Sequence, residues 1–166
     1  MRIESLQGSL SSWPINLKRL IIAFVLILNV GFFTGFSFVG ETTSFNKKGI
    51  EENYLGNEDD ENAEVMLFKK SKREVLTLVH NHILSLAVIF FMLALLLYLS
   101  EVPHLWRSLL MWEPFISLLL TFGGIYILWL GVSWFSYVIM ISGTALVISI
   151  IGMSFFILKS CLTKDS

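Results

Sequence analysis

The stretch that decides the fold is residues 75–99, VLTLVHNHILSLAVIFFMLALLLYL, which contains no Asp, Glu, Lys or Arg. A helix of about 20 mostly apolar residues crosses the roughly 30 Å of hydrocarbon in a bilayer. The apolar residues of this stretch are continuous, whereas the strands of a membrane barrel alternate apolar and polar residues. Because the hydrocarbon holds no water to bind the backbone, the stretch is predicted to be a transmembrane helix.

Three further stretches have the same character, at residues 20–39, 114–130 and 134–158. The sequence therefore predicts an all-α integral membrane bundle of four transmembrane helices. Gly131-Val132-Ser133 leaves room only for a tight turn, so the last two helices should form an antiparallel hairpin. The remaining segments are an N-terminal tail (1–19), a long polar, acidic loop (40–74), an interfacial segment (103–112) and a C-terminal tail (159–166).

The composition of the chain agrees with a membrane protein. Of its 166 residues, 55% are hydrophobic and 15% are charged, and the net charge is −1. Soluble domains carry about a quarter charged residues, so these values exclude a disordered protein, a nucleic-acid binder and an ordinary cytosolic globule. The single cysteine, Cys161, excludes an intrachain disulfide framework and a CxxC metal or redox site.

The distribution of basic residues leaves the orientation nearly balanced. Residues 40–74 carry six Lys and Arg, and the tails together with residues 103–112 also carry six. Lys18 and Arg19 stand directly before the first helix, which usually dominates orientation. We therefore expect both termini to be cytoplasmic.

His80-Asn81-His82 is the most suggestive chemical pattern. Neighbours two apart on a helix point about 200° away from each other, so the two imidazoles are poorly placed to bind one ion, and no metal site is predicted. Haem ligation by His80 or His82 would need a second ligand at the same depth, and Met140 fits by its position. The alternatives are a hydrogen-bonded structural pair, or a contact with a quinone, a lipid or a partner subunit.

Polar residues inside the predicted helices form a candidate cluster. An amide in hydrocarbon needs partners, so Asn29 is predicted to point inward and to bind a hydroxyl of this cluster or Ser142. The residues of the candidate cluster are Asn29, Thr34, Ser85, Thr121, Tyr126, Tyr137 and Thr144. A polar clamp between helices is the expected role of such groups.

Small residues predict close contacts between helices. Gly31 and Gly35 form a GxxxG motif in the first helix, and the later helices contribute Gly123, Gly124, Gly143 and Gly152. Small residues let membrane helices approach closely. They mark either seams inside the bundle or the face of an oligomer, and both interpretations stay open.

The predicted spans contain no Asp, Glu, Lys or Arg in their hydrocarbon parts, with Glu101 and Glu113 at the edges. Proton-coupled transporters usually keep such a group inside the membrane, so its absence counts against transport. No catalytic motif is present and no catalytic residue is assigned, which makes an enzyme improbable.

Two interpretations concern the polar loop. Its acidic middle, residues 57–64, lacks the spacing and the glycine of a calcium-binding loop, and is expected to be a solvated, mobile linker. The stretch from Gly49 to Asn57 contains a tyrosine and a Gly-Asn turn signal, and can dock on the ends of the helices.

Three stretches resemble a family of small bacterial inner-membrane proteins: residues 74–86 (EVLTLVHNHILSL), 49–57 and 141–155. The resemblance covers about half of the chain. It implies a four-span protein of the bacterial inner membrane in which His-x-His is a family motif, and it supplies no substrate or cofactor.

The expected function is that of a non-enzymatic accessory or structural component of a larger membrane assembly. The expected partners are the lipid bilayer and either further copies of the chain or other membrane subunits. One alternative is a redox subunit that binds haem, a metal or a quinone through His80 and His82. A second alternative is a component of small-molecule transport.

Overall fold

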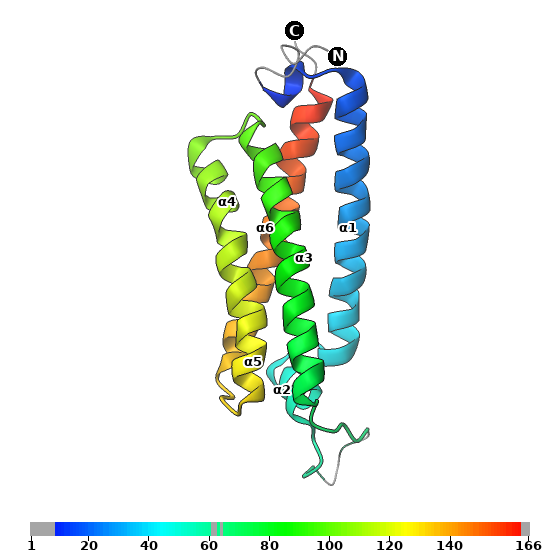
Figure 1. The fold of residues 1–166 in the computed structure, drawn as a ribbon, viewed down its shortest axis with the longest axis vertical. Helices are drawn as coiled ribbons and strands as arrows, with labels where there is room; N and C mark the ends of the chain where they lie inside the picture. The colour runs from blue at the N-terminus through cyan, green and yellow to red at the C-terminus, as the bar shows by residue number, and fades with distance from the viewer. Residues whose placement is uncertain (1–8, 61–62, 64, 164–166) are drawn as a thin grey trace.

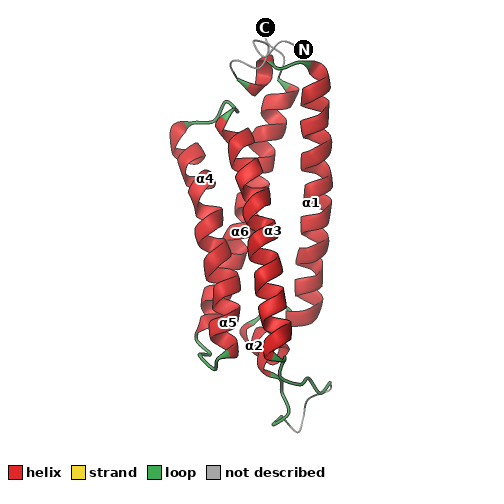
Figure 2. Cartoon of the chain, in the orientation of Figure 1, coloured by secondary structure: helices red, strands yellow, loops and turns green. Residues whose placement is uncertain are grey.

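A computed structural model describes residues 9–60, 63 and 65–163 of the chain. The described part is helical and contains no strand (Figure 2). Four of its helices are long and apolar enough to cross a membrane, which confirms the predicted four-span, all-α fold. They are α1 (Ile15–Thr43), α3 (Lys72–Tyr98), α6 (Phe135–Leu162), and a continuous helix from His104 to Trp129 that we call the third span.

The four long helices run side by side (Figure 1). Helices α3 and α6 lie in the middle, with the third span on one side and α1 on the other. Both described ends of the chain lie at one end of the bundle, and the short helix α2 (Lys47–Leu55) lies at the opposite end. The main core is built from fully buried side chains that include Phe90, Leu93, Leu97, Ile150, Met153 and Ile157.

Helix α3 begins at a complete capping box. The Ser71 hydroxyl accepts from the Glu74 backbone N–H, and the Glu74 carboxylate accepts from the Ser71 backbone N–H. This arrangement satisfies two backbone donors that the first helical turn leaves without a partner. The helix therefore starts at Lys72, three residues before the apolar stretch, and carries Lys72 and Arg73 at its end.

The third span differs from the expected division into an interfacial segment (103–112) and a helix (114–130). One continuous helix begins after Pro103 and passes through Pro114, and its three parts are α4 (His104–Leu118), a π-helical turn η3 (Leu119–Gly123) and α5 (Gly124–Trp129). Proline costs a helix one backbone hydrogen bond. Here Leu110 and Pro114 are both buried against the bundle, so packing holds the helix together across the proline.

Helix α2 docks on the ends of the long helices, as expected for residues 49–57. Asn46 caps its first turn by accepting from the Gly49 N–H at 2.8 Å. Ile50 and Tyr54 are buried in a second core with side chains that include Val75, Ile125, Leu128 and Ile139. Burial of the two apolar side chains thus fixes this part of the polar loop.

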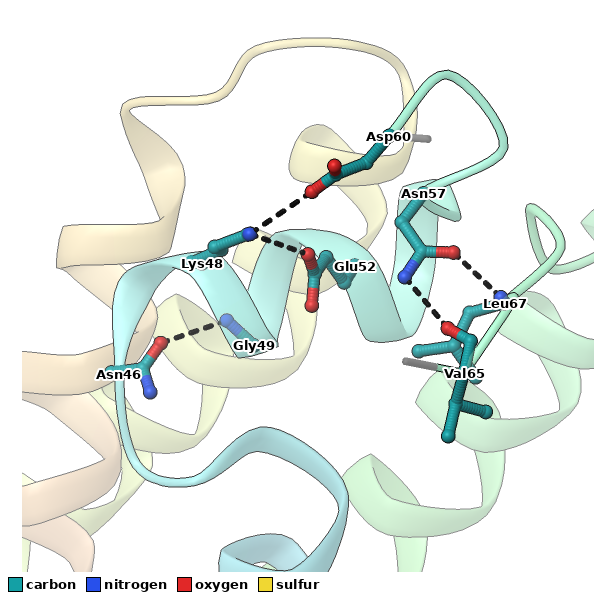
Figure 3. Close-up of polar contacts among 8 residues, drawn as sticks. All are labelled: Asn46, Lys48, Gly49, Glu52, Asn57, Asp60, Val65 and Leu67. Atoms are coloured by element: carbon teal, nitrogen blue, oxygen red, sulfur yellow. Dashed lines mark hydrogen bonds and ion pairs between the residues drawn. The ribbon is translucent and has the colours of Figure 1, made fainter. Parts of the chain in front are cut away.

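The described residues at the ends of the acidic stretch make specific polar contacts (Figure 3). The mobility expected for this stretch stays a prediction. The Asn57 side chain donates to the Val65 carbonyl at 3.0 Å and accepts from the Leu67 N–H at 2.6 Å. Lys48 bridges Glu52 at 3.4 Å and Asp60 at 3.1 Å. The rest of the stretch, Glu61, Asn62 and Glu64, lies outside the described residues.

Polar contacts close the end of the bundle where the termini lie. Lys18 is buried, and its ammonium donates to the Thr163 carbonyl at 3.2 Å, just beyond the last turn of α6. A cation at this place complements the partial negative charge of a helix C-terminus. The Ser11 hydroxyl donates to the Glu101 carboxylate at 2.8 Å and joins the N-terminal segment to the loop before the third span.

Candidate functional site

Buried serines follow α6 along its whole length, and each contacts a different segment of the chain. Ser136 donates to Glu51 of α2 at 3.2 Å, and Ser142 shares a hydrogen bond with Thr121 of η3 at 2.7 Å. Ser160 accepts from the backbone N–H of Glu101 at 3.4 Å. The full set is Ser136, Ser142, Ser149, Ser154 and Ser160. Helix α6 therefore holds the bundle together through hydroxyl groups as well as apolar contacts.

Ser149 contacts an acidic side chain within the third span, Glu113 of α4. The Ser149 hydroxyl donates to one oxygen of the Glu113 carboxylate. The hydroxyl of Ser117, one turn further along α4, donates to the other oxygen. Both serines are buried and Glu113 is half-buried. A carboxylate thus lies in the seam between α4 and α6 with a hydroxyl donor on each oxygen.

The depth of Glu113 corrects the expectation that the spans lack charge in their hydrocarbon parts. Ser149 is at the middle of α6, which has 28 residues, so it lies roughly 20 Å from either end of the helix. Glu113 lies about 14 Å inside the third span, counted from His104. A bilayer has about 30 Å of hydrocarbon, so both counts place the carboxyl inside it. The sequence did not predict this site, because a helix that begins at Pro114 leaves Glu113 outside the span.

Close packing of α4 on α6 brings Glu113 and Ser149 together. A Cβ atom added to Gly152 would lie 3.3 Å from the Leu110 Cδ2 atom, tighter than ordinary contact. Leu110 and Glu113 are one turn apart on α4, and Ser149 and Gly152 are one turn apart on α6. The glycine thus allows the helix approach that the carboxyl contact needs. Gly124 has the same role further along, where an added Cβ would lie 3.2 Å from Ile139 Cγ1.

The other predicted glycines do not allow a closer approach of two helices in this chain. An added Cβ at Gly143 would be in ordinary contact, 4.0 Å from Thr121 Cγ2. At Gly31, Gly35 and Gly123 it would meet nothing within 4 Å. The GxxxG motif of α1 therefore does not form a seam inside this chain.

The candidate polar cluster is not one cluster in the structure. Asn29 points inward as predicted, but its amide donates at 2.8 Å to Ser154, which lay outside the predicted set. Thr121 and Ser142 do meet. The hydroxyls of Thr34, Ser85 and Thr144 are exposed and donate to carbonyls one turn back in their own helices. Such local bonding satisfies a hydroxyl without a second helix, and that is why depth alone did not predict the partners.

The two tyrosines of the predicted set belong to the α2 end of the bundle. Tyr126 stacks on Trp129, with ring centroids 6.0 Å apart. Lys47 lies over the Tyr137 ring at 5.2 Å from its centroid. They contact neighbours at the membrane edge and do not reach Asn29.

The histidines lie at the surface of α3. Both are exposed, and the His82 ring stacks on Phe122 of the third span with centroids 4.7 Å apart. The His82 Nδ1 atom lies 2.9 Å from the Leu78 carbonyl, so it carries the proton in this hydrogen bond. In the described part of the chain, no three His, Cys, Asp or Glu side chains lie close enough to hold a metal ion. Haem ligation with Met140 stays a prediction.

A shallow depression of about 480 Å³ runs along the same face of α3. Its lining residues are Arg73, Glu74, Thr77, Leu78, Asn81 and His82. All of them belong to the first turns of one helix, so the depression is a groove along a single helix.

A model of a family of transmembrane helical domains, Aq_1264_TM, matches residues 44–166. The chain belongs to this family. The Aq_1264_TM domain contains α2, α3, the third span and α6, and therefore contains Glu113, Ser117, Ser149 and the two histidines. Helix α1 ends at Thr43, so all of it precedes the matched part. Searches of curated proteins and of solved structures find no match.

Proposed function

We propose that this integral membrane protein of the Aq_1264_TM family is a non-enzymatic accessory component of a larger assembly, joined to it through α1. The observation that carries the proposal is the exposure of the second half of α1. Only 11% of its most apolar stretch is buried, against 39% for α6. Around the GxxxG motif, Ile27, Val30 and Phe38 are 73%, 68% and 68% exposed.

The partner we expect on this surface is α1 of a second copy of the chain. Lipid gives no hydrophobic drive for helix association, so membrane helices associate through close packing of small residues. Gly31 and Gly35 lie one turn apart on the exposed part of α1, with open space in front of both. A GxxxG surface fits a second GxxxG surface, and the chain itself supplies one.

Cysteine crosslinking tests this proposal sharply. The native Cys161 is buried, and a Cys161→Ser background removes it. In that background, Val30→Cys on α1 should give disulfide-linked dimers in native membranes. Phe155→Cys on the equally exposed surface of α6 is the matched control and should not. Dimers from both positions, or from neither, would contradict the proposal.

Native electrophoresis after extraction in a mild detergent gives a second test. The natural protein should migrate as an assembly, and Gly31→Val with Gly35→Val should release the single chain. The double variant should still fold, because a Cβ atom added at either glycine would meet none of the described residues within 4 Å. A natural protein that runs as a lone chain would overturn the proposal.

Transport is the second candidate function, and the carboxyl of Glu113 favours it. The sequence argued against transport, because the predicted spans hold no Asp, Glu, Lys or Arg in their hydrocarbon parts. An acidic side chain inside a span is the feature that proton-coupled transporters use. Proteoliposomes loaded with a pH-sensitive dye should show a proton flux that Glu113→Gln abolishes, and a flux equal in both would dismiss this candidate.

For the finer location, we propose the bacterial inner membrane with both termini in the cytoplasm. The resemblance of residues 74–86 and the position of Lys18 and Arg19 before the first span support this placement.

A further inference from the structure

We propose that Glu113, with the hydroxyls of Ser117 and Ser149, forms a proton-binding site inside the membrane. This inference does not depend on the role proposed for α1, because all three residues lie in the third span and α6. It rests on the surroundings of the carboxyl, on the number of oxygen atoms around it, and on the chemistry of the two hydroxyls.

No counter-charge accompanies the carboxyl. Neither α3 from Val75 to Tyr98 nor α6 from Phe135 to Leu158 contains an Asp, Glu, Lys or Arg. In the described part of the chain, no hydrogen bond or ion pair joins Glu113 to a titratable side chain of its own helix or of the helices packed on it. These side chains are Lys72, Arg73, Glu74, His80, His82, Tyr98, His104, Arg107, Tyr126, Tyr137, Lys159 and Cys161. An isolated carboxylate in hydrocarbon is costly, so a small cation has to neutralise it.

The oxygen atoms at the site suit a proton better than a metal ion. Two carboxylate oxygens and two hydroxyls make four, and the described residues supply no further partner. Calcium and magnesium ions take six or more oxygen ligands. A proton needs one oxygen to bind it and one to accept its hydrogen bond, and the site supplies both.

The two serines can serve both protonation states. With the carboxylate ionised, both hydroxyls donate to it, as in the structure. When a proton binds, one hydroxyl turns, accepts from the new carboxyl O–H and donates its own hydrogen to a carbonyl one turn back in its helix. No polar group then loses its partner in either state. Alanine at either position would remove this adaptability.

Labelling with dicyclohexylcarbodiimide tests the proposal in native membranes. This apolar reagent enters the hydrocarbon and reacts with protonated carboxyl groups, and Glu113 is only half-buried. We expect one label, mapped by peptide mass spectrometry to Glu113, whose yield falls as the pH is raised. Glu113→Gln should lose the label, whereas Glu101→Gln, at the end of the bundle, should keep it.

The variant Ser149→Ala separates a proton site from a merely reactive carboxyl. The carboxylate loses one of its two hydrogen-bond donors, so labelling should persist to a higher pH than in the natural protein. The result does not depend on whether Glu113→Gln folds, because the natural protein and Ser149→Ala both keep the carboxyl.

Three results would overturn the proposal. The first is labelling mapped away from Glu113, and the second is labelling of Glu113 with a yield independent of pH. The third is protection by sodium ions at constant pH, which would assign the carboxyl to a metal cation instead.

Discussion

Asn29 is one of the side chains that join α1 to the rest of the bundle. Its amide donates to the Val25 carbonyl at 2.7 Å and to the Ser154 hydroxyl at 2.8 Å. Ser154 is buried, so water does not replace the amide if it is removed. Interhelical hydrogen bonds in membranes contribute about 0.6 kcal/mol on average and rarely more than about 1.7 kcal/mol.

We expect a double-mutant cycle of Asn29→Leu and Ser154→Ala to give a coupling energy of about 0.6–1.7 kcal/mol. Unfolding in mixed micelles would measure it. Thr34→Val is the matched control, because its exposed hydroxyl bonds only to its own helix, and it should change stability by less than about 0.5 kcal/mol. Additive effects of the two variants would mean that the contact does not form.

Tyr54 gives a prediction on pH. Burial in the α2 core raises the pKa of its phenol to about 12, above the ordinary value of 10.0. In the unfolded chain the phenol therefore loses its proton first. Tyr54 should leave stability unchanged below about pH 10 and should reduce it by up to about 2–3 kcal/mol as the pH rises to about 12.

The measurement is the unfolding free energy of the natural protein and of Tyr54→Phe across this range. The difference between the two should appear only above about pH 10. If both proteins lose stability in parallel, the buried phenol is not the cause.

At the scale of the element, the corner between α1 and α2 is a tight turn. Ser44 and Phe45 have φ angles of 49° and 50°, in the left-handed region. The Phe45 ring stacks on Phe36 with centroids 4.7 Å apart. A Cβ atom at Gly49 would lie 2.1 Å from the Thr43 carbonyl oxygen, so only glycine fits beside this corner.

Gly49→Ala should therefore push α2 away from the bundle. We expect faster cleavage by trypsin at Lys47 and Lys48, severalfold above the natural protein, while the four long helices stay intact. Gly31→Ala is the matched control, because an added Cβ there meets nothing within 4 Å. Equal cleavage in both variants would show that α2 does not depend on this contact.

The number of membrane-spanning helices could be predicted from the sequence, because bilayer thickness sets the length of an apolar stretch. The extent of the third span could not be predicted in this way. Pro114 matches the first turn of a helix in local terms, and only the burial of Leu110 and Pro114 shows why the helix continues. The position of Glu113 depended on this boundary, so the main candidate site was missed with it.

The hydrogen-bond partners of the polar residues could not be predicted from the sequence either. Depth along each helix can be counted from residue numbers. The rotation of each helix about its own axis cannot be counted in this way. This rotation decides that the Asn29 side chain meets Ser154, and that the Thr34 hydroxyl bonds only within its own helix. Contacts between helices therefore need the packed bundle.

At the scale of the whole molecule, both described ends of the chain lie at one end of the bundle (Figure 1). The turn Leu10–Ser12 lies at one end of the bundle, and the segment after α2 lies at the other (Figure 1). Ser12 and Asp59 are exposed in these two segments, so they report on the two sides of the membrane. In a Cys161→Ser background, a membrane-impermeant maleimide added to intact cells should label Asp59→Cys and not Ser12→Cys. Permeabilised cells should label both.

Labelling of both variants in intact cells would contradict the four-span fold. Labelling of Ser12→Cys alone would keep the fold and reverse the proposed orientation. The experiment therefore tests the fold and the direction of insertion separately.

The buried serines of α6 also bear on biosynthesis. Helix α6 follows every one of its partners in the chain, so Asn29, Thr121 and Glu113 enter the bilayer before the hydroxyls that bind them have left the ribosome. Translation that halts before this helix leaves an amide and a carboxyl facing lipid. Such a product exposes to lipid polar groups that the complete bundle covers.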